Sequence, residues 1–290
     1  MGRRRRKSKQ NKLGPVLITQ VNELFESKKW DISDEHKHSL YNRFINTLAM
    51  FENNDQRKLF LRLSQNFKYI DFNEYKNKLV CLLEKAITEI YDTFKLNHSQ
   101  RKIYIMPLKT NEDRDEIKSS DCISYLCKGT NIFYSDILYS KKFEILGSIE
   151  MVKKNVNTLK DKKLFLIDDF IGTANYASKV IDELTSIAEI NKENIIVLSI
   201  YMYKKGYENL KSKNIKTIYL ELLDDNNIKE LDENELNLIL SMEKKLNVEE
   251  DFSLGYEGSG CLISLIRTPN NTLPIFWMDK STSNAPFPRR

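Results

Sequence analysis

Between residues 102 and 223 the chain alternates short apolar runs with stretches of helical periodicity, and this alternation restricts the fold more than any other feature. Apolar strands alternating with helices are typical of a mostly parallel sheet with crossover helices. We expect strands at residues 102–107, 131–135, 163–168, 194–203 and 215–223, and helices at 175–190 and 204–213. Since ligands bind at the carboxyl ends of such strands, the sequence predicts an α/β domain with its site in the loops after Met106, Ser135, Asp168 and Tyr203.

Residues 14–97 have the spacing of helices. Leu17, Val21 and Leu24 mark a first amphipathic helix. We expect Ser33, Asp55 and Asn73 to cap three further helices. Residues 67–70 form a short β-like link between the last two of them. This pattern fits a winged helix-turn-helix and fits a plain helical bundle equally well.

The composition excludes several classes of protein. The four cysteines have no CxxC spacing, which argues against a zinc site or a disulfide framework and favours a reducing cytoplasm. The three histidines, His36, His38 and His98, lie outside the α/β region, so histidine-based catalysis is not expected there. No apolar run approaches 18 residues, so we expect no membrane partner.

The positive net charge comes from one short segment. Residues 1–12 hold seven Lys and Arg and no acid, and removing those seven from the chain's 46 leaves 39 against 41 Asp and Glu. A basic tail of this kind is expected to be disordered by itself and suits phosphate backbones. It therefore predicts a nucleic acid or nucleoprotein partner, contacted by Arg3, Arg4, Arg5, Arg6 and Lys7; the alternative is a tail that only keeps the protein in solution.

Residues 164–176, Leu-Phe-Leu-Ile-Asp-Asp-Phe-Ile-Gly-Thr-Ala-Asn-Tyr, carry the most chemical information. An apolar strand delivers Asp168 and Asp169 at its end, and a loop of small and polar residues leads into a helix. Unpaired N–H groups at a helix start suit a phosphate, and ionised carboxylates accept hydrogen bonds from two ribose hydroxyls. The segment therefore predicts a ribose phosphate site, with the phosphate on Gly172, Thr173, Ala174, Asn175 and Tyr176.

Other proteins place acids at the same position. Receiver domains and hydrolases with an aspartyl nucleophile also have a strand that ends in Asp-Asp before a helix. Carboxylates at strand ends can also be simple helix caps. The residues alone leave these alternatives open.

The segment resembles the phosphoribosyl pyrophosphate-binding motif of type I phosphoribosyltransferases, in which a hydrophobic strand leads to two acids, two hydrophobic residues and Thr-Thr-Gly-x-Thr. Residues 255–262 and 268–277 resemble the C-terminal signature of phosphoribosyltransferase-like proteins of bacterial conflict systems. Some members of that family accompany retron reverse transcriptases. The resemblance implies a type I phosphoribosyltransferase-like fold, preceded by a helical, winged-helix-like region.

The resemblance also implies roles for further residues. Lys118, Ser119 and Ser120 would hold the pyrophosphate, although serines before a helix are often caps. Lys141 and Lys142 lie where the family has its flexible catalytic loop, at about residues 138–160, and would neutralise pyrophosphate charge; otherwise they are a solvated pair. Mg²⁺ would assist near Asp168 and Asp169, without a full set of protein ligands.

Two departures from the family pattern are visible. Thr-Thr-Gly-x-Thr is replaced by Gly-Thr-Ala-Asn-Tyr at residues 172–176, and the segment after Met106 is long and charged where a short glycine-rich turn is expected.

Near the C-terminus, a short helix is expected at residues 261–266. There the base would be read by Asn270 and Asn271 and stacked on Trp277 or Tyr256. Alternatively, Trp277 fills the core and the asparagines bond to their own backbone.

The expected organisation is a disordered basic tail (1–13), a helical domain (14–97), a phosphoribosyltransferase-like domain with a C-terminal hood (98–280) and a loose end (281–290). The resemblance favours a cytoplasmic antiphage effector that binds phosphoribosyl pyrophosphate or a nucleotide and acts at the N-glycosidic carbon. The alternative is a nucleotide-sensing module that docks a reverse transcriptase with its nucleic acid. The base, the acceptor, the trigger and the oligomeric state are not determined by the sequence.

Overall fold

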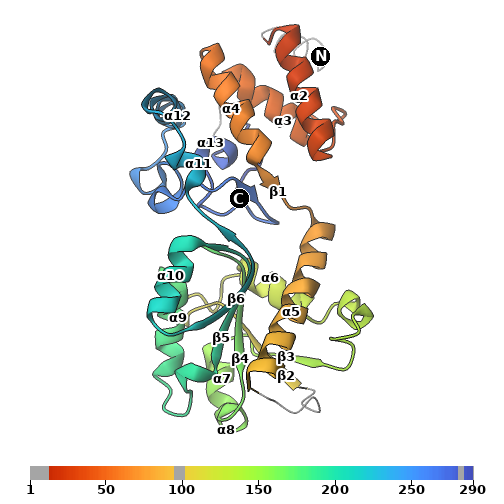
Figure 1. Ribbon diagram of the computed structural model, residues 1–290, viewed down its shortest axis with the longest axis vertical. Coiled ribbons are helices and arrows are strands. Elements are labelled where there is room, and N and C mark those ends of the chain that lie inside the picture. The colour runs from red at the N-terminus through yellow and green to blue at the C-terminus, as the bar shows by residue number, and fades with distance from the viewer. Residues whose placement is uncertain (1–12, 95–101, 280–283, 290) are drawn as a thin grey trace. The chain divides into compact units, whose positions relative to one another are not determined.

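Five parallel strands form the sheet around which one part of the molecule is built (Figure 1). The computed structural model describes residues 13–94, 102–279 and 284–289. The strand order is β3-β2-β4-β5-β6, and every neighbouring pair runs parallel. This confirms the predicted α/β class. The strands are β2 (Lys102–Pro107), β3 (Lys142–Ile145), β4 (Leu164–Ile171), β5 (Ile195–Tyr203) and β6 (Lys216–Leu223).

Helices cover both faces of this sheet. On one face Met106, Leu166 and Val197 pack in a core with α7 (Ile149–Lys154), α9 (Asn175–Thr185) and α10 (Lys204–Ser212). Successive residues of a strand point to opposite faces, so the residues between these three face the other way. On that side α5 (Phe72–Phe94) contacts β5 and β6, and α6 (Ser119–Leu126) contacts β2 and β4.

The strand order fixes where a ligand can bind. The chain passes from β2 to β3 on one side and then returns to β4 on the other side of β2. A crevice opens at such a switch point, outside the carboxyl ends of the two central strands. The loops after β2 and β4 therefore meet at the position where this class of sheet binds its ligands.

The chain divides into two compact units, one from Asp71 to Leu223 and the other from its two terminal parts, up to Ile70 and from Asp224. We call this second unit the terminal unit. Its N-terminal and C-terminal parts are held together by parallel pairing of β1 (Lys68–Tyr69) with β7 (Ile263–Ser264). Its helices are α2 (Pro15–Lys28), α3 (Leu40–Met50), α4 (Asn54–Asn66), α11 (Asn226–Lys229), α12 (Glu233–Lys245) and α13 (Pro274–Trp277).

Aromatic side chains from both ends of the sequence form the core of the terminal unit. The ring of Phe67 stacks on Phe287 with centroids 4.3 Å apart, and the ring of Phe60 stacks on Phe276 at 4.6 Å. Trp30 packs edge-on against Phe287. The expectation of a loose end is therefore wrong for residues 284–289, because Phe287 is an integral core residue.

The division also differs from the expected domain boundaries. The helix α5 packs on the sheet because its apolar side is buried there, and residues 224–279 group with the N-terminal helices. The β-like link at 67–70 pairs with the C-terminal β7. Within the described ranges this unit shows no β-hairpin, so the winged interpretation gains no support.

Several local predictions are wrong. Residues 131–135 form a 3₁₀ helix (Thr130–Tyr134) in place of a strand, and residues 261–266 contain β7 in place of a helix. The stretch expected to be a flexible catalytic loop holds β3, α7 and α8 (Val156–Leu159), which are fixed by buried Phe143, Leu146 and Val152.

The expected helix caps are also displaced. The N-caps of α3 and α4 are Ser39 and Asn53, whose side chains accept from backbone N–H groups, where Ser33 and Asp55 were expected. At the start of α5 the carboxylate of Asp71 accepts from the backbone N–H of Glu74, a role expected for Asn73. The helix α12, which begins with a capping box at Asp232, was not predicted.

Candidate functional site

The loop between β4 and α9, residues 172–174, is held in a compact shape by α10. Ala174 has a left-handed backbone conformation with φ of 64°, which turns the chain into α9. Gly206 of α10 lies so close that a Cβ on it would be 2.0 Å from the backbone oxygen of Gly172. The side chain of Asn209 donates to the backbone oxygen of Thr173 at 2.8 Å. Residues 172–174 precede the amino end of the 11-residue helix α9. We call them the phosphate loop, after the phosphate that the sequence predicts there.

Asp168 and Asp169 lie near the end of β4 and have different partners. The carboxylate of Asp168, which is partly exposed, accepts from the hydroxyl of Ser119 at 3.0 Å and from the backbone N–H of Asp169 at 2.9 Å. The carboxylate of Asp169 is 3% exposed and accepts from the hydroxyl of Tyr75, in α5, at 3.3 Å. Asp168 is therefore the more exposed residue of the pair, and Asp169 is enclosed.

Burial changes the acid strength of this group. It raises the pKa of Asp168 well above the usual value for aspartate, and the neighbouring charge of Asp169 adds to the effect. Burial also raises the pKa of Asp169, against the hydrogen bonds that it accepts. The pKa of Tyr75 is raised by burial and then by both carboxylates, so its hydroxyl stays a donor. The pair thus resists carrying two negative charges until donors or cations approach.

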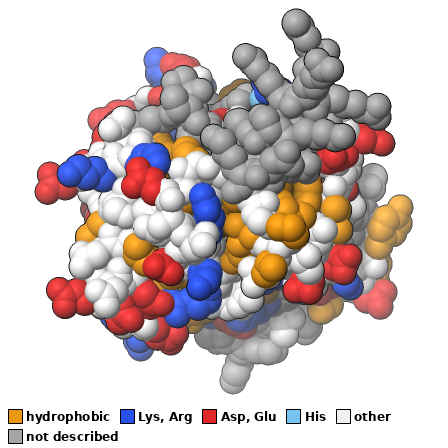
Figure 2. Space-filling model, turned by 90° about the horizontal axis from the view of Figure 1, so that it is seen from above, with side chains coloured by type: hydrophobic (Ala, Val, Ile, Leu, Met, Phe, Trp, Pro, Cys, Tyr) orange, Lys and Arg blue, Asp and Glu red, His pale blue; other side chains and the backbone are white. Residues whose placement is uncertain are grey.

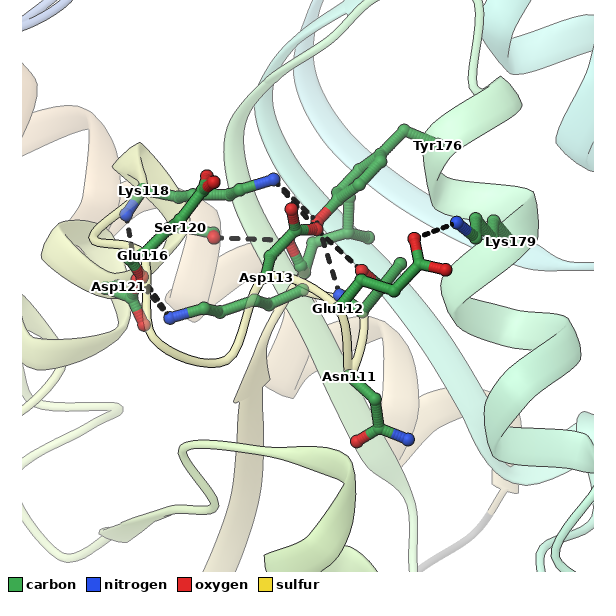
Figure 3. Close-up of polar contacts among 12 residues, drawn as sticks. Asn111, Glu112, Asp113, Glu116, Lys118, Ser120, Asp121, Tyr176 and Lys179 are labelled. Atoms are coloured by element: carbon green, nitrogen blue, oxygen red, sulfur yellow. Dashed lines mark hydrogen bonds and ion pairs between the residues drawn. The ribbon is translucent and has the colours of Figure 1, made fainter.

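The loop after β2 closes over the amino end of α9 through a polar cluster (Figure 3). Oδ2 of Asp113 accepts from the hydroxyl of Thr110 at 2.6 Å and lies 2.9 Å from Nζ of Lys118. The same oxygen accepts from the hydroxyl of Tyr176, in the first turn of α9. The loops after β2 and β4 are therefore tied together through Asp113, at the switch point of the sheet.

The residues predicted to hold a pyrophosphate have separate roles in the structure. Lys118 bonds within the Asp113 cluster, and Ser119 donates to Asp168. Ser120 is buried and donates to the backbone oxygen of Leu108. The predicted catalytic lysines lie in and beside the edge strand: Lys142 is the first residue of β3, paired with Lys102, and Lys141 is largely buried.

The residues expected to read a base belong to the terminal unit. Trp277 is buried and donates to the backbone oxygen of Thr272 at 2.7 Å. The amide of Asn271 donates to Ser259, and the backbone oxygen of Asn270 accepts from the backbone N–H of Tyr256. Trp277 therefore lies in the core, as in the alternative account, whereas the side chain of Asn271 bonds to Ser259 and Tyr256 and not to its own backbone.

Four important residues were missed by the sequence reasoning: Tyr75, Asp113, Gly206 and Asn209. Tyr75 belongs to a helix that was assigned to the N-terminal domain, and Asp113 lies in a charged loop without a recognisable pattern. Gly206, in a stretch of otherwise good helix formers, was the one available signal, since glycine within a helix often marks a close backbone approach.

The described residues contain no group of three or more His, Cys, Asp or Glu side chains that could hold a metal ion by themselves. All four cysteines lie in the described ranges and are free thiols. In that same part of the chain no helix is long and apolar enough to cross a membrane. On the face drawn in Figure 2 charged side chains of both signs are interspersed. Arg3, Arg4, Arg5, Arg6 and Lys7 lie outside the described residues.

A protein-family model matches most of the chain. The model of the family PRTase-CE matches residues 41–289, which include the five strands and most of the terminal unit. No curated protein matches the chain.

Proposed function

Since this chain belongs to the PRTase-CE family, phosphoribosyltransferase-like proteins associated with conflict systems, we propose that it binds a ribose 5-phosphate compound at the switch point of its sheet. The observation that carries the proposal is the pairing of a reachable carboxylate, Asp168, with the phosphate loop, at the end of one strand. A phosphoribosyl group presents hydroxyls and a phosphate within a few ångströms of each other. The two halves of the site match those two groups.

In this proposal Asp168 accepts a hydrogen bond from a ribose hydroxyl, and Asp169 has a positioning role. Asp169 is enclosed by α5 and fixed by Tyr75, so its charge acts on the ligand from behind Asp168. A positive charge that develops at ribose C1 as an N-glycosidic bond breaks or forms would be stabilised by this pair. The phosphate loop would hold the 5-phosphate through backbone N–H groups at the start of α9.

Magnesium fits this site only together with its ligand. Two adjacent carboxylates without a third ligand match the way Mg²⁺ is held partly by protein and partly by substrate phosphates. When bound, the ion would neutralise charge on the pyrophosphate of phosphoribosyl pyrophosphate. Asp168 is the residue that would contact it, directly or through water.

The biological role follows the family. We propose that the protein is an effector of a bacterial antiphage system and that its partner is a reverse transcriptase with its nucleic acid. Residues 3–7 would supply contacts to phosphate backbones. Toxicity would then come from depletion or modification of a nucleotide, or from modification of nucleic acid.

A second candidate function is nucleotide sensing without turnover. The observation that favours it is that Tyr176 is tied to Asp113 and Thr110 of the loop after β2, because a cluster that must open for each ligand slows repeated turnover. Departures from the threonine-rich loop of the biosynthetic enzymes point in the same direction.

Calorimetric titration with ribose 5-phosphate and with phosphoribosyl pyrophosphate, both with Mg²⁺, tests the proposal. We expect Asp168→Asn to weaken binding at least about tenfold, as loss of a charged hydrogen-bond acceptor does. Asp161→Asn makes the same change at an exposed position just before β4 and should leave affinity unchanged. Equal affinities of both variants would refute the site. Release of pyrophosphate or free base distinguishes an enzyme from a sensor.

A further inference from the structure

A single carboxylate oxygen collects donors from both ends of the loop between β2 and α6 and from the first turn of α9. Oδ2 of Asp113 accepts from Thr110 in the loop after β2 and from Tyr176 in α9, and it pairs with Lys118 before α6 (Figure 3). Surface carboxylates seldom have more than one such partner, and exposed ion pairs contribute little. Here the side chains of Asp113 and Lys118 are only 19% and 26% exposed.

The donors are arranged around that oxygen by contacts of their own. The hydroxyl of Tyr176 accepts from Nζ of Lys118 at 3.0 Å and from the backbone N–H of Thr110 at 3.2 Å. The ammonium group of Lys118 also lies 4.4 Å from the centroid of the Tyr176 ring. Two hydroxyls and a cation with a fixed geometry are the donor set that proteins present to a phosphate oxygen.

Asp113 belongs to a segment that is held from outside the cluster. Lys109 is buried and bonds to Asp121 at 3.1 Å, and it also donates to the backbone oxygen of Glu116. The backbone N–H of Asn111 donates to Glu183 of α9 at 3.0 Å. Between Asn111 and Glu116 lie residues 112–115, of which Glu112, Arg114 and Asp115 are exposed. The segment can swing outward without unpacking the core.

Electrostatics agree with this geometry. Although partial burial opposes it, hydrogen bonds from Thr110, Tyr176 and Lys118 hold the pKa of Asp113 far below the usual value for aspartate. The carboxylate is thus a permanent anion at neutral pH. Ser119, which follows Lys118, donates to Asp168, so the cluster adjoins the carboxylate assigned to the ribose.

We propose that Asp113 is an internal occupant of a phosphate-binding site, and that a phosphate or diphosphate group of the ligand must displace it before the site can fill. The inference deepens the proposed function and rests on it for the identity of the ligand. Displacement frees Thr110, Lys118 and Tyr176 for the incoming oxyanion and carries residues 112–115 outward. The free protein is therefore autoinhibited, and its apparent affinity is reduced by the fraction of molecules that remain closed.

The test compares Asp113→Asn with Asp115→Asn in the full chain, using inorganic pyrophosphate and ribose 5-phosphate as separate probes. Both changes remove one negative charge from the same segment, but Asp115 pairs only with Arg114, and its side chain is 88% exposed. We expect Asp113→Asn to bind a probe about tenfold or more tightly than Asp115→Asn. The probe whose affinity rises identifies whether the site takes the diphosphate or the 5-phosphate of the ligand. Adding Lys118→Met to Asp113→Asn should remove the gain.

Equal affinities of the two variants for both probes would overturn the proposal and assign Asp113 to a purely structural tie. If the Asp113 variant does not fold, the parent protein supplies the second measurement. Tryptic cleavage after Arg114 should accelerate when pyrophosphate is added, because the segment leaves the cluster; unchanged or slower cleavage would contradict the displacement. A gain in pyrophosphate affinity that survives Asp168→Asn would sustain this site even where the ribose assignment fails. Loss of ribose 5-phosphate binding in Asp168→Asn, with no gain in Asp113→Asn, would leave only the proposed function standing.

Discussion

We expect Gly206→Ala to destabilise the protein and to weaken its binding of ribose 5-phosphate, against the usual effect of alanine in a helix. Gly206 lies in α10, where helix propensity alone predicts a gain of about 1 kcal/mol. The added Cβ, however, would lie 2.0 Å from the oxygen and 3.1 Å from the carbon of the Gly172 carbonyl. Real Cβ atoms essentially never approach another atom within 3.0 Å, so the two segments must separate by roughly 1 Å.

The size of the effect follows from these two terms. Forced separation of packed backbone segments costs about 1–3 kcal/mol, so the net loss of stability should be up to about 2 kcal/mol once the propensity gain is subtracted. For a protein of this size that corresponds to a fall of up to roughly 3 °C in the unfolding midpoint. Displacement of the phosphate loop by 1 Å should also weaken ligand binding by about tenfold or more.

Thermal unfolding and calorimetric titration measure both consequences. Gly147→Ala is the matched control, because a Cβ there meets only the sulfur of Met151, at an ordinary 3.8 Å. A Gly206→Ala protein as stable as the parent, with unchanged affinity for ribose 5-phosphate, would refute the role of α10 in shaping the phosphate loop.

Three further predictions follow from other parts of the chain. Because burial raises the pKa of Asp168 in the folded protein, that group favours folding below the ordinary aspartate pKa and loses this contribution as pH rises through its folded value. Asp168→Asn should therefore be more stable than the parent by about 1 kcal/mol at pH 8 and by much less near pH 4. Urea unfolding at the two pH values measures this difference. A gain in stability that does not depend on pH would contradict the raised pKa of Asp168. Arg43→Met should lower the free energy of unfolding by about 3 kcal/mol, because it leaves the carboxylate of Asp279 and the backbone oxygen of Ala285 without the guanidinium donor. Arg62→Met, at an exposed ion pair, should lower it by less than about 0.5 kcal/mol. Similar unfolding midpoints for the two variants would show that the buried pair is unimportant. Deleting residues 1–12 should abolish salt-dependent binding of nucleic acid in titrations from low to physiological salt, and an unchanged salt slope would remove the tail from that role.

The strand pattern was predictable where apolar runs were long and bounded by helices. All nine residues of β5 are buried, and its run of apolar and aromatic residues is interrupted only by Ser199, a pattern typical of a strand covered on both faces. Residues 131–135 were misassigned because five residues are too few for periodicity to distinguish a strand from a 3₁₀ helix. In the structure Phe133 and Tyr134 are exposed, and only Ile132 is buried in that helix.

The acids of the site were predictable, but their surroundings were not. Asp168 and Asp169 directly follow the apolar residues 164–167, which the sequence displays, although β4 continues to Ile171. Tyr75 contacts Asp169 from a helix far away in the sequence, and Asp113 meets Tyr176 across two loops. Such contacts depend on tertiary packing. No local spacing of residues predicts these contacts, so only the strand and its loop could be predicted from the sequence.

The pairing of β1 with β7 has a consequence for how the chain becomes a finished protein. On the ribosome, residues 71–223 emerge as one continuous stretch and can complete their fold while translation continues. The aromatic core around Phe67 must wait for Phe276 and Phe287, which follow the sheet unit in the sequence. Premature termination before Phe276 would therefore release a folded sheet together with an incomplete terminal unit, whose exposed rings would mark the product for aggregation or degradation.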